Sequence, residues 1–229
     1  MNKAVNIFSI LILGVFTLLS LIIVYDLAIS NLHLKAMPYK KEVLYGLSIL
    51  FFLIGLLRIK ARWQGARDMK NFSQFDFETS ISKTFKKRCL SFTTIEILFT
   101  LGAILLFYNM SILEFDLMIV MIGVMTVLLF EAVIYLVRVA KGGPSFRVGL
   151  NKEIIAYFGR EMRLYYFDSL QRVELHQSDL ISFKYKGDLV LFMPTDVLEE
   201  EDKVKFRDTL IQLLEEKNIY FDDRFRNWK

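Results

Sequence analysis

Two glutamates stand inside segments that otherwise lack charge. Glu96 is the only charged residue within residues 90–113, and Glu131 is the only one within residues 117–137. A carboxylate in the hydrocarbon of a bilayer costs several kcal/mol unless it is protonated, hydrated or paired, so such residues are candidates for binding a cation or passing a proton. Each glutamate lies about two helical turns from the basic end of its segment. Antiparallel segments would therefore hold both at a similar depth.

Basic residues near the same segments offer these glutamates a structural role instead. Arg138 follows Glu131 by seven residues and Arg88 precedes Glu96 by eight, so each pair falls on one helix face. Paired glycine or proline breaks and an inverted repeat, which transporters often show, are absent from the sequence. We therefore expect the glutamates to be structural, and a small transporter or channel subunit that uses Glu96 and Glu131 stays open as an alternative.

A second group of candidate residues is basic. Lys83, Lys86, Lys87 and Arg88 stand just before the apolar segment at residue 90, and aromatic residues are interleaved with cations in residues 61–77. Cations mixed with aromatics suit the membrane–water interface, where they bind anionic lipid headgroups. The same composition also arises as the plain basic flank of a membrane span, which is the interpretation we favour.

The elements that hold these residues are apolar helices. The chain has 229 residues, and 54% of them are hydrophobic, above the usual 45–50% or so of soluble domains. The excess is concentrated before residue 140, in runs close to the roughly 20 residues that cross a bilayer as a helix. We expect four transmembrane helices within residues 1–140, at residues 5–25, 43–57, 90–113 and 117–137.

The distribution of basic residues predicts the orientation. Nine Lys or Arg residues lie within residues 58–88, whereas residues 114–116 contain none. Basic loops stay in the cytoplasm, so a cytoplasmic loop at 58–89 is expected, with both termini on the same side of a multi-pass protein of the bacterial inner (cytoplasmic) membrane. Because the net charge of +4 sits mainly beside membrane spans, we do not expect binding to nucleic acid.

The period of the apolar residues changes after residue 145. Short runs rich in β-branched and aromatic residues alternate with turn signals, and the sequence Lys186-Gly187-Asp188 predicts a hairpin. The pattern predicts six strands, at residues 146–148, 154–158, 163–167, 170–175, 180–185 and 189–193.

An amphipathic helix is expected after the strands. Asp196 and Glu199 have the spacing of a capping box, and Asn218 is a residue that can end the helix. Its apolar residues form one stripe that must cover a sheet, namely Phe206, Leu210, Leu213 and Leu214. We therefore expect an α+β domain over residues 145–218, followed by a tail at residues 219–229.

This order resembles the bacterial pleckstrin-homology-like (PH-like) domains. The resemblance rests on residues 164–175, where Phe167, Asp168, Leu170 and Val173 match a step that commonly leads from one strand to the next in that family. It implies a bent antiparallel sheet capped by one helix and fused to membrane spans. The resemblance carries over no catalytic residue and no lipid-binding residue.

The sequence contains no signature of an enzyme. Cys89 is the single cysteine, His33 and His176 lie far apart, and no metal, cofactor or nucleophile motif is present. We expect no catalysis and no cofactor, and instead an adaptor that offers its PH-like module to an unidentified protein or to the membrane surface. The open edge of the sheet and the groove beside the helix are the expected partner surfaces. Besides the bilayer, self-association into a homo-oligomer is left open as a partner. A third alternative is an immunity or accessory membrane protein of a secretion or toxin system.

Overall fold

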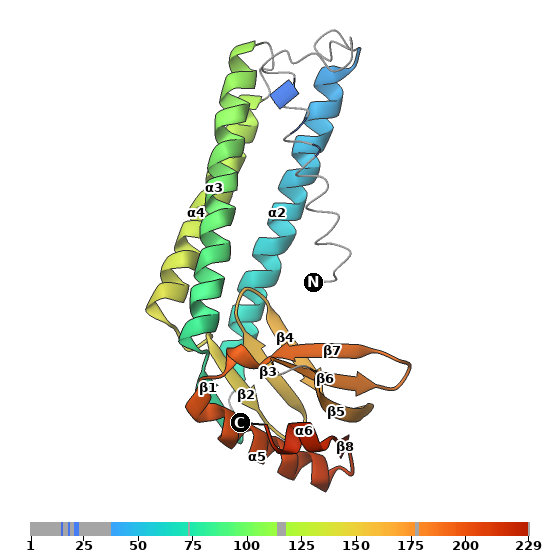
Figure 1. The fold of residues 1–229 in the computed structure, drawn as a ribbon. Helices are drawn as coiled ribbons and strands as arrows, with labels where there is room; N and C mark the ends of the chain where they lie inside the picture. Colours follow the sequence, from blue (N-terminus) through green and yellow to red (C-terminus); the bar gives the residue numbers. More distant parts are fainter. Residues whose placement is uncertain are drawn as a thin grey trace. The chain divides into compact units, whose positions relative to one another are not determined.

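The computed structural model describes residues 15, 18, 21, 22, 38–72, 74–113, 118–176 and 179–228 (Figure 1). These residues form two compact units. The membrane unit combines Met1–Lys60 with Phe92–Val137, and the sheet unit combines Ala61–Ser91 with Arg138–Lys229. Apart from four positions, the first expected span at residues 5–25 lies outside the described residues.

Three long helices account for the other three expected spans. They are α2 (Lys40–Asn71), α3 (Lys83–Leu113) and α4 (Met118–Lys141), and each is long and apolar enough to cross a membrane. Large apolar side chains such as Leu53, Leu105 and Phe130 are exposed on them, as suits helices surrounded by lipid. The chain is therefore compatible with a multi-pass membrane protein.

The helices of the membrane unit pack through a small apolar core. Its buried residues come from all three helices. Gly55 on α2 permits a close approach to α4, because a methyl group there would come within 2.9 Å of Leu128 Cδ1. The hydroxyl of Ser48 donates to the carbonyl of Leu44 on its own helix at 2.7 Å, which satisfies a polar group without water. The core residues are Leu44, Ala103, Phe107, Met125 and Leu128.

The segment expected as a basic loop at residues 58–89 is largely regular structure. Helix α2 continues to Asn71, a strand β1 occupies Phe77–Ser80, and α3 begins at Lys83. Helix α2 is prolonged because residues 58–71 are rich in strong helix formers. A methyl group on Gly65 would come within 2.9 Å of Met162 Cβ, so this part of α2 packs directly on the sheet unit's own strands.

The sheet unit contains two four-stranded sheets in place of one bent sheet. All six expected strands are present, and the additional strands are β1 and β8. The first sheet has the antiparallel order β1-β2-β3-β4, and the second has the order β7-β6-β5-β8, in which only β5 and β8 are parallel. The bounds are β2 Arg147–Leu150, β3 Ile154–Phe158, β4 Met162–Tyr166, β5 Leu170–His176, β6 Leu180–Tyr185, β7 Val190–Pro194 and β8 Tyr220–Phe221.

The pairing of β1 with β2 joins two distant parts of the chain. Phe77 lies opposite Leu150 and Ser80 opposite Arg147, whereas both α3 and α4 come between the two strands in the sequence. A membrane crossed by both helices is therefore crossed twice, and β1 and β2 lie on the same side of it. The expected self-contained domain at 145–218 is thus incomplete without a strand from the segment between α2 and α3.

Helix α5 (Glu200–Glu216) is the expected amphipathic helix, and it covers sheet residues with its apolar stripe. Four stripe residues are buried, Phe206, Leu210, Leu213 and Leu214, and Phe206 meets Phe77 of β1 edge to face at 5.6 Å between ring centres. The expected capping box is wrong. Asp196 belongs to a short 3-10 helix, η2 (Thr195–Val197), and the N-cap Glu199 makes no side-chain bond to its own helix.

The tail is folded against the second sheet. Strand β8 pairs with β5, and the short helix α6 (Asp223–Arg226) follows it. The carboxylate of Asp222 accepts from the backbone N–H of Phe225 at 2.9 Å and thereby caps α6. Phe225 and Trp228 are buried and stack at 6.2 Å. Residues 219–228 are therefore part of the sheet unit, and Ile219, Phe225 and Trp228 belong to its core.

Candidate functional site

The two intramembrane glutamates do not form a recognisable ion site. Glu96 on α3 and Glu131 on α4 are both half-buried, and each has an interaction partner. Among the described residues, no group of three His, Cys, Asp or Glu side chains could hold a metal ion.

The arginines expected to pair with the glutamates make other contacts. Arg88 Nη1 lies 2.6 Å from Asp196 Oδ2, within the sheet unit. The guanidinium of Arg138 stacks over the ring of Trp63, 4.3 Å from its centre. Spacing along one helix suggested these arginines as partners for the glutamates, but tertiary contacts engage both of them.

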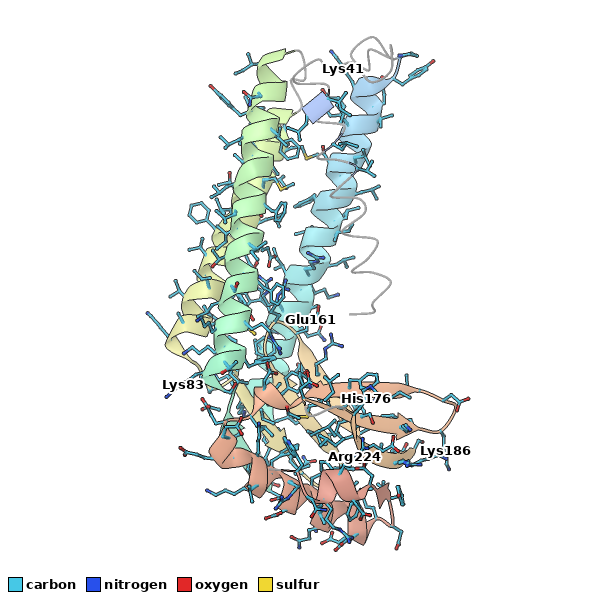
Figure 2. All side chains as sticks on the ribbon, viewed as in Figure 1. Lys41, Lys83, Glu161, His176, Lys186 and Arg224 are labelled. Atoms are coloured by element: carbon cyan, nitrogen blue, oxygen red, sulfur yellow. The ribbon has the colours of Figure 1, made fainter. Side chains whose placement is uncertain are left out.

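The basic cluster of Lys83, Lys86, Lys87 and Arg88 occupies the first turns of α3, whose start Figure 2 marks by Lys83. The backbone N–H of Lys83 donates to Glu199 Oε1 at 2.8 Å. Two acidic residues that precede α5, Glu199 and Asp196, thus contact the cluster at the amide of Lys83 and the guanidinium of Arg88. These contacts assign part of the cluster a structural role.

Arg147 at the start of β2 links three elements. Its Nη2 donates to the carbonyls of Met69 at 2.7 Å and Phe72 at 2.6 Å, which lie at the end of α2. Its Nη1 pairs with Glu78 of β1 at 2.6 Å. The last carbonyls of a helix have no partner inside the helix, so this arginine caps α2 and fixes it to the first sheet.

The outer face of the second sheet remains uncovered by any described element. The strand register places the side chains of this face in two rows across the sheet. One row runs Val190, Lys184, Arg172 and Tyr220, from β7 to β8. The next row runs Phe192, Ser182 and Glu174, from β7 to β5. Residues directly opposite each other share one face of a sheet, and the intervening residues, such as Val173 and Phe183, are fully buried on the other. We define the outer face by Arg172, Glu174, Lys184, Val190, Phe192 and Tyr220.

Ion pairs and aromatic rings organise this outer face. Glu174 pairs with Arg172, and its Oε2 lies 2.5 Å from Lys184 Nζ. The guanidinium of Arg172 also lies over the ring of Tyr220, at 4.7 Å from its centre. The exposed fractions are 57% for Tyr220, 45% for Phe192 and 37% for Val190. The face therefore combines a fixed charged centre with apolar side chains on both sides.

The sheet edges, by contrast, are partly occupied. The hydroxyl of Tyr165 on β4 donates to the carbonyl of Phe192 on β7 at 2.8 Å, and β8 covers the other edge of the same sheet. Burial raises the pKa of Tyr165, so its hydroxyl stays a donor at physiological pH. One carbonyl of β7 and the open side of β5 in this sheet thus already have partners.

Strands β1 and β8 and the outer face were not predicted from the sequence, because each of them depends on pairing with distant residues. Phe75, Phe77 and Thr79 alternate with polar residues, which is a strand signal, but the strand is short and its partner is distant. Tyr220 and Phe192 take their place beside Arg172 and Lys184 only through pairings across the sheet.

No family model, characterised protein or solved structure shows a detectable similarity to this chain.

Proposed function

We propose that this chain is a membrane-anchored adaptor without catalytic activity, which presents a PH-like module to a protein partner on the cytoplasmic side. The observation that carries the proposal is the uncovered outer face, with its exposed Val190, Phe192 and Tyr220. Aromatic residues and arginine are enriched in the cores of protein interfaces. The outer face holds both kinds of residue on one rigid sheet.

Two features support the PH-like character of the module and its cytoplasmic location. Six consecutive strands, β2 to β7, precede helix α5, and strands followed by one covering helix are the order that the PH-like resemblance implies. The excess of Lys and Arg in residues 58–88 favours the cytoplasm for the sheet unit. For the transporter alternative, the described part of the chain holds no group of three His, Cys, Asp or Glu side chains that could bind a metal ion.

Site-specific photo-crosslinking in the producing cell tests the adaptor proposal. Benzoylphenylalanine is placed at Phe192, at Tyr220 and, as a control, at Lys205, an exposed position of α5. We expect positions 192 and 220 to yield the same discrete protein adduct, identified by mass spectrometry, and position 205 to yield none. An adduct with twice the mass of the chain would identify a second copy as the partner.

The decisive comparison is between the two surfaces. A probe that crosslinks equally from Lys205 and from the outer face reports random collision, and the proposal then fails. It also fails if neither outer-face position gives an adduct. A Glu174→Lys variant, which removes the carboxylate between Arg172 and Lys184, should reduce the yield at position 192 while the amount of protein in the membrane stays constant.

A further inference from the structure

We propose that the outer face binds an acidic protein segment, which places an Asp or Glu side chain beside Arg172 and Lys184 and apolar side chains on both sides of that acid. This inference rests on the proposed function, because it specifies the kind of partner that the adaptor binds. The charge balance of the face and the spacing of its apolar side chains both favour such a segment.

The charges on the outer face are only partly balanced. Among the six residues that define the face, Arg172 and Lys184 are cations and Glu174 is the one carboxylate. Arg172 and Lys184 lie directly opposite each other on β5 and β6, where like charges repel. The carboxylate of Glu174 bridges them, since it pairs with Arg172 and its Oε2 lies 2.5 Å from Lys184 Nζ. One positive charge on the face is left without a counter-charge.

The two cations keep hydrogen-bond donors for a partner, whereas the carboxylate is largely used. The side chains of Arg172 and Lys184 are 45% and 43% exposed, and that of Glu174 is only 18% exposed. A guanidinium and an ammonium together carry more N–H donors than one carboxylate can accept. A partner that covers the face removes water from these donors, and a charge buried without compensation is costly. A carboxylate from the partner supplies the missing counter-charge.

Glu174 has a different role from the partner's acid. Because it contacts both cations at once, it fixes their position before a partner arrives, which lowers the cost of ordering them on binding. Replacing Glu174 with Lys adds positive charge but removes this fixed arrangement. The reduced crosslinking expected for Glu174→Lys therefore agrees with an acidic partner.

Apolar side chains stand at both ends of the row that holds the two cations. This row begins at Val190 on β7 and ends at Tyr220 on β8, with side chains that are 37% and 57% exposed. The order β7-β6-β5-β8 puts its ends three strand spacings apart, or roughly 14 Å. About four residues of extended chain or about nine residues of α-helix cover this length. The partner segment therefore has an acid between two apolar residues at one of these spacings.

Two other occupants fit the outer face less well. A second copy bound through the same face would bring Arg172 and Lys184 of both copies together, and like charges across an interface oppose association. An anionic bilayer surface is recognised by clusters of about four to eight Lys or Arg residues, whereas the residues that define this face leave a single positive charge. Both occupants are distinguished from the acidic segment by the test.

The test measures photo-crosslinking from benzoylphenylalanine at Phe192 of the full chain in open native membranes, relative to the amount of chain present. We expect Lys184→Glu to lower the adduct yield about tenfold, because it replaces attraction with repulsion, and Lys184→Arg to keep it within a factor of about two. Lys205→Glu is the matched control, since it makes the same change of charge at an exposed position of α5, and its yield should equal that of the unaltered chain. Raising the salt concentration from about 0.1 M to about 1 M should also lower the yield of the unaltered chain.

The outcomes separate this inference from the adaptor proposal. If the unaltered chain gives no protein adduct, or only a phospholipid adduct, both fail. If a protein adduct forms but Lys184→Glu lowers its yield no more than Lys205→Glu, the adaptor proposal stands and the acidic partner is refuted. The acidic partner is also refuted if the peptide crosslinked to position 192, from a second copy or from another protein, has no Asp or Glu flanked by apolar residues. If Lys184→Glu does not accumulate in the membrane, the salt series decides, and a yield independent of salt refutes the acidic partner.

Discussion

Arg147 connects α2, β1 and β2 within the sheet unit, and replacing it with Met tests how much this connection stabilises the fold. The variant keeps the length of the side chain but loses the donors to the carbonyls of Met69 and Phe72. It also loses the pair with Glu78 and the contact with the Phe75 ring at 5.2 Å. The end of α2 would then be detached from the first sheet.

The expected cost follows from burial and charge. The side chain of Arg147 is only 16% exposed, whereas that of Glu78 is 47% exposed, so the ion pair contributes about 1 kcal/mol or less. Hydrogen bonds from a charged donor contribute about 1.5–3 kcal/mol each. Since both carbonyl bonds share Nη2, we expect Arg147→Met to lower the free energy of unfolding by about 3–5 kcal/mol. The free energy of unfolding of Arg147→Lys should lie between those of the unaltered chain and Arg147→Met. A lysine ammonium keeps the positive charge but cannot reproduce the planar guanidinium, which donates to several acceptors at once.

Urea unfolding in detergent, followed by tryptophan fluorescence, provides the assay. Trp63 and Trp228 are the only two tryptophans of the chain, and both belong to the sheet unit. The matched control is Arg163→Met, whose pair with Glu161 is exposed and should be worth less than about 1 kcal/mol. If Arg147→Met is no more destabilising than Arg163→Met, the role assigned to Arg147 is wrong.

Three further predictions concern the sheet unit. Gly149→Ala should lower the free energy of unfolding by about 1–3 kcal/mol, because the new methyl group would come within 2.4 Å of the Phe75 ring. Gly102→Ala is the control, because no atom lies within 4 Å of its new methyl group. Equal urea midpoints for the two variants would refute the prediction. Burial raises the pKa of Tyr185 from 10 to about 12. The unfolded chain therefore loses the Tyr185 proton first, and the contribution of this group to the free energy of unfolding, constant below pH 10, should fall as the pH rises from 10 toward 12. A decrease of the urea midpoint over this pH range that is equally steep in Tyr185→Phe would contradict the prediction. Trp228→Ala should cost about 3 kcal/mol and speed proteolysis of residues 219–228, whereas a resistant tail would show that Trp228 does not hold it.

Local patterns in the sequence predicted most elements but few of their partners. The apolar runs became α2, α3 and α4, and the alternating runs became β2 to β7, since both signals depend on neighbours within one element. The Gly187 hairpin also followed, because Gly187 and Asp188, in the short connection between Tyr185 and Leu189, both have the positive φ that Gly and Asp tolerate. These features need no knowledge of distant contacts.

Pairings between distant residues could not be predicted in this way. Strand β1 has four residues, and its partner β2 follows only after two helices. Glu199 had the spacing of a capping residue for α5, but its carboxylate binds the start of α3 instead. The outer face requires β5, β6, β7 and β8 to be in register, and no periodicity within one strand reports that register.

The most direct test of the adaptor account is the protection of position 192 in native membranes. Phe192→Cys and Lys205→Cys are made in a Cys89→Ser chain, and labelling by a maleimide is timed in open membrane fragments before and after a urea wash that strips bound proteins. If a partner covers the outer face, labelling at position 192 is slow and becomes fast after the wash, whereas labelling at position 205 is fast throughout. Equally fast labelling at both positions before the wash would show that no partner occupies the outer face and would contradict the account.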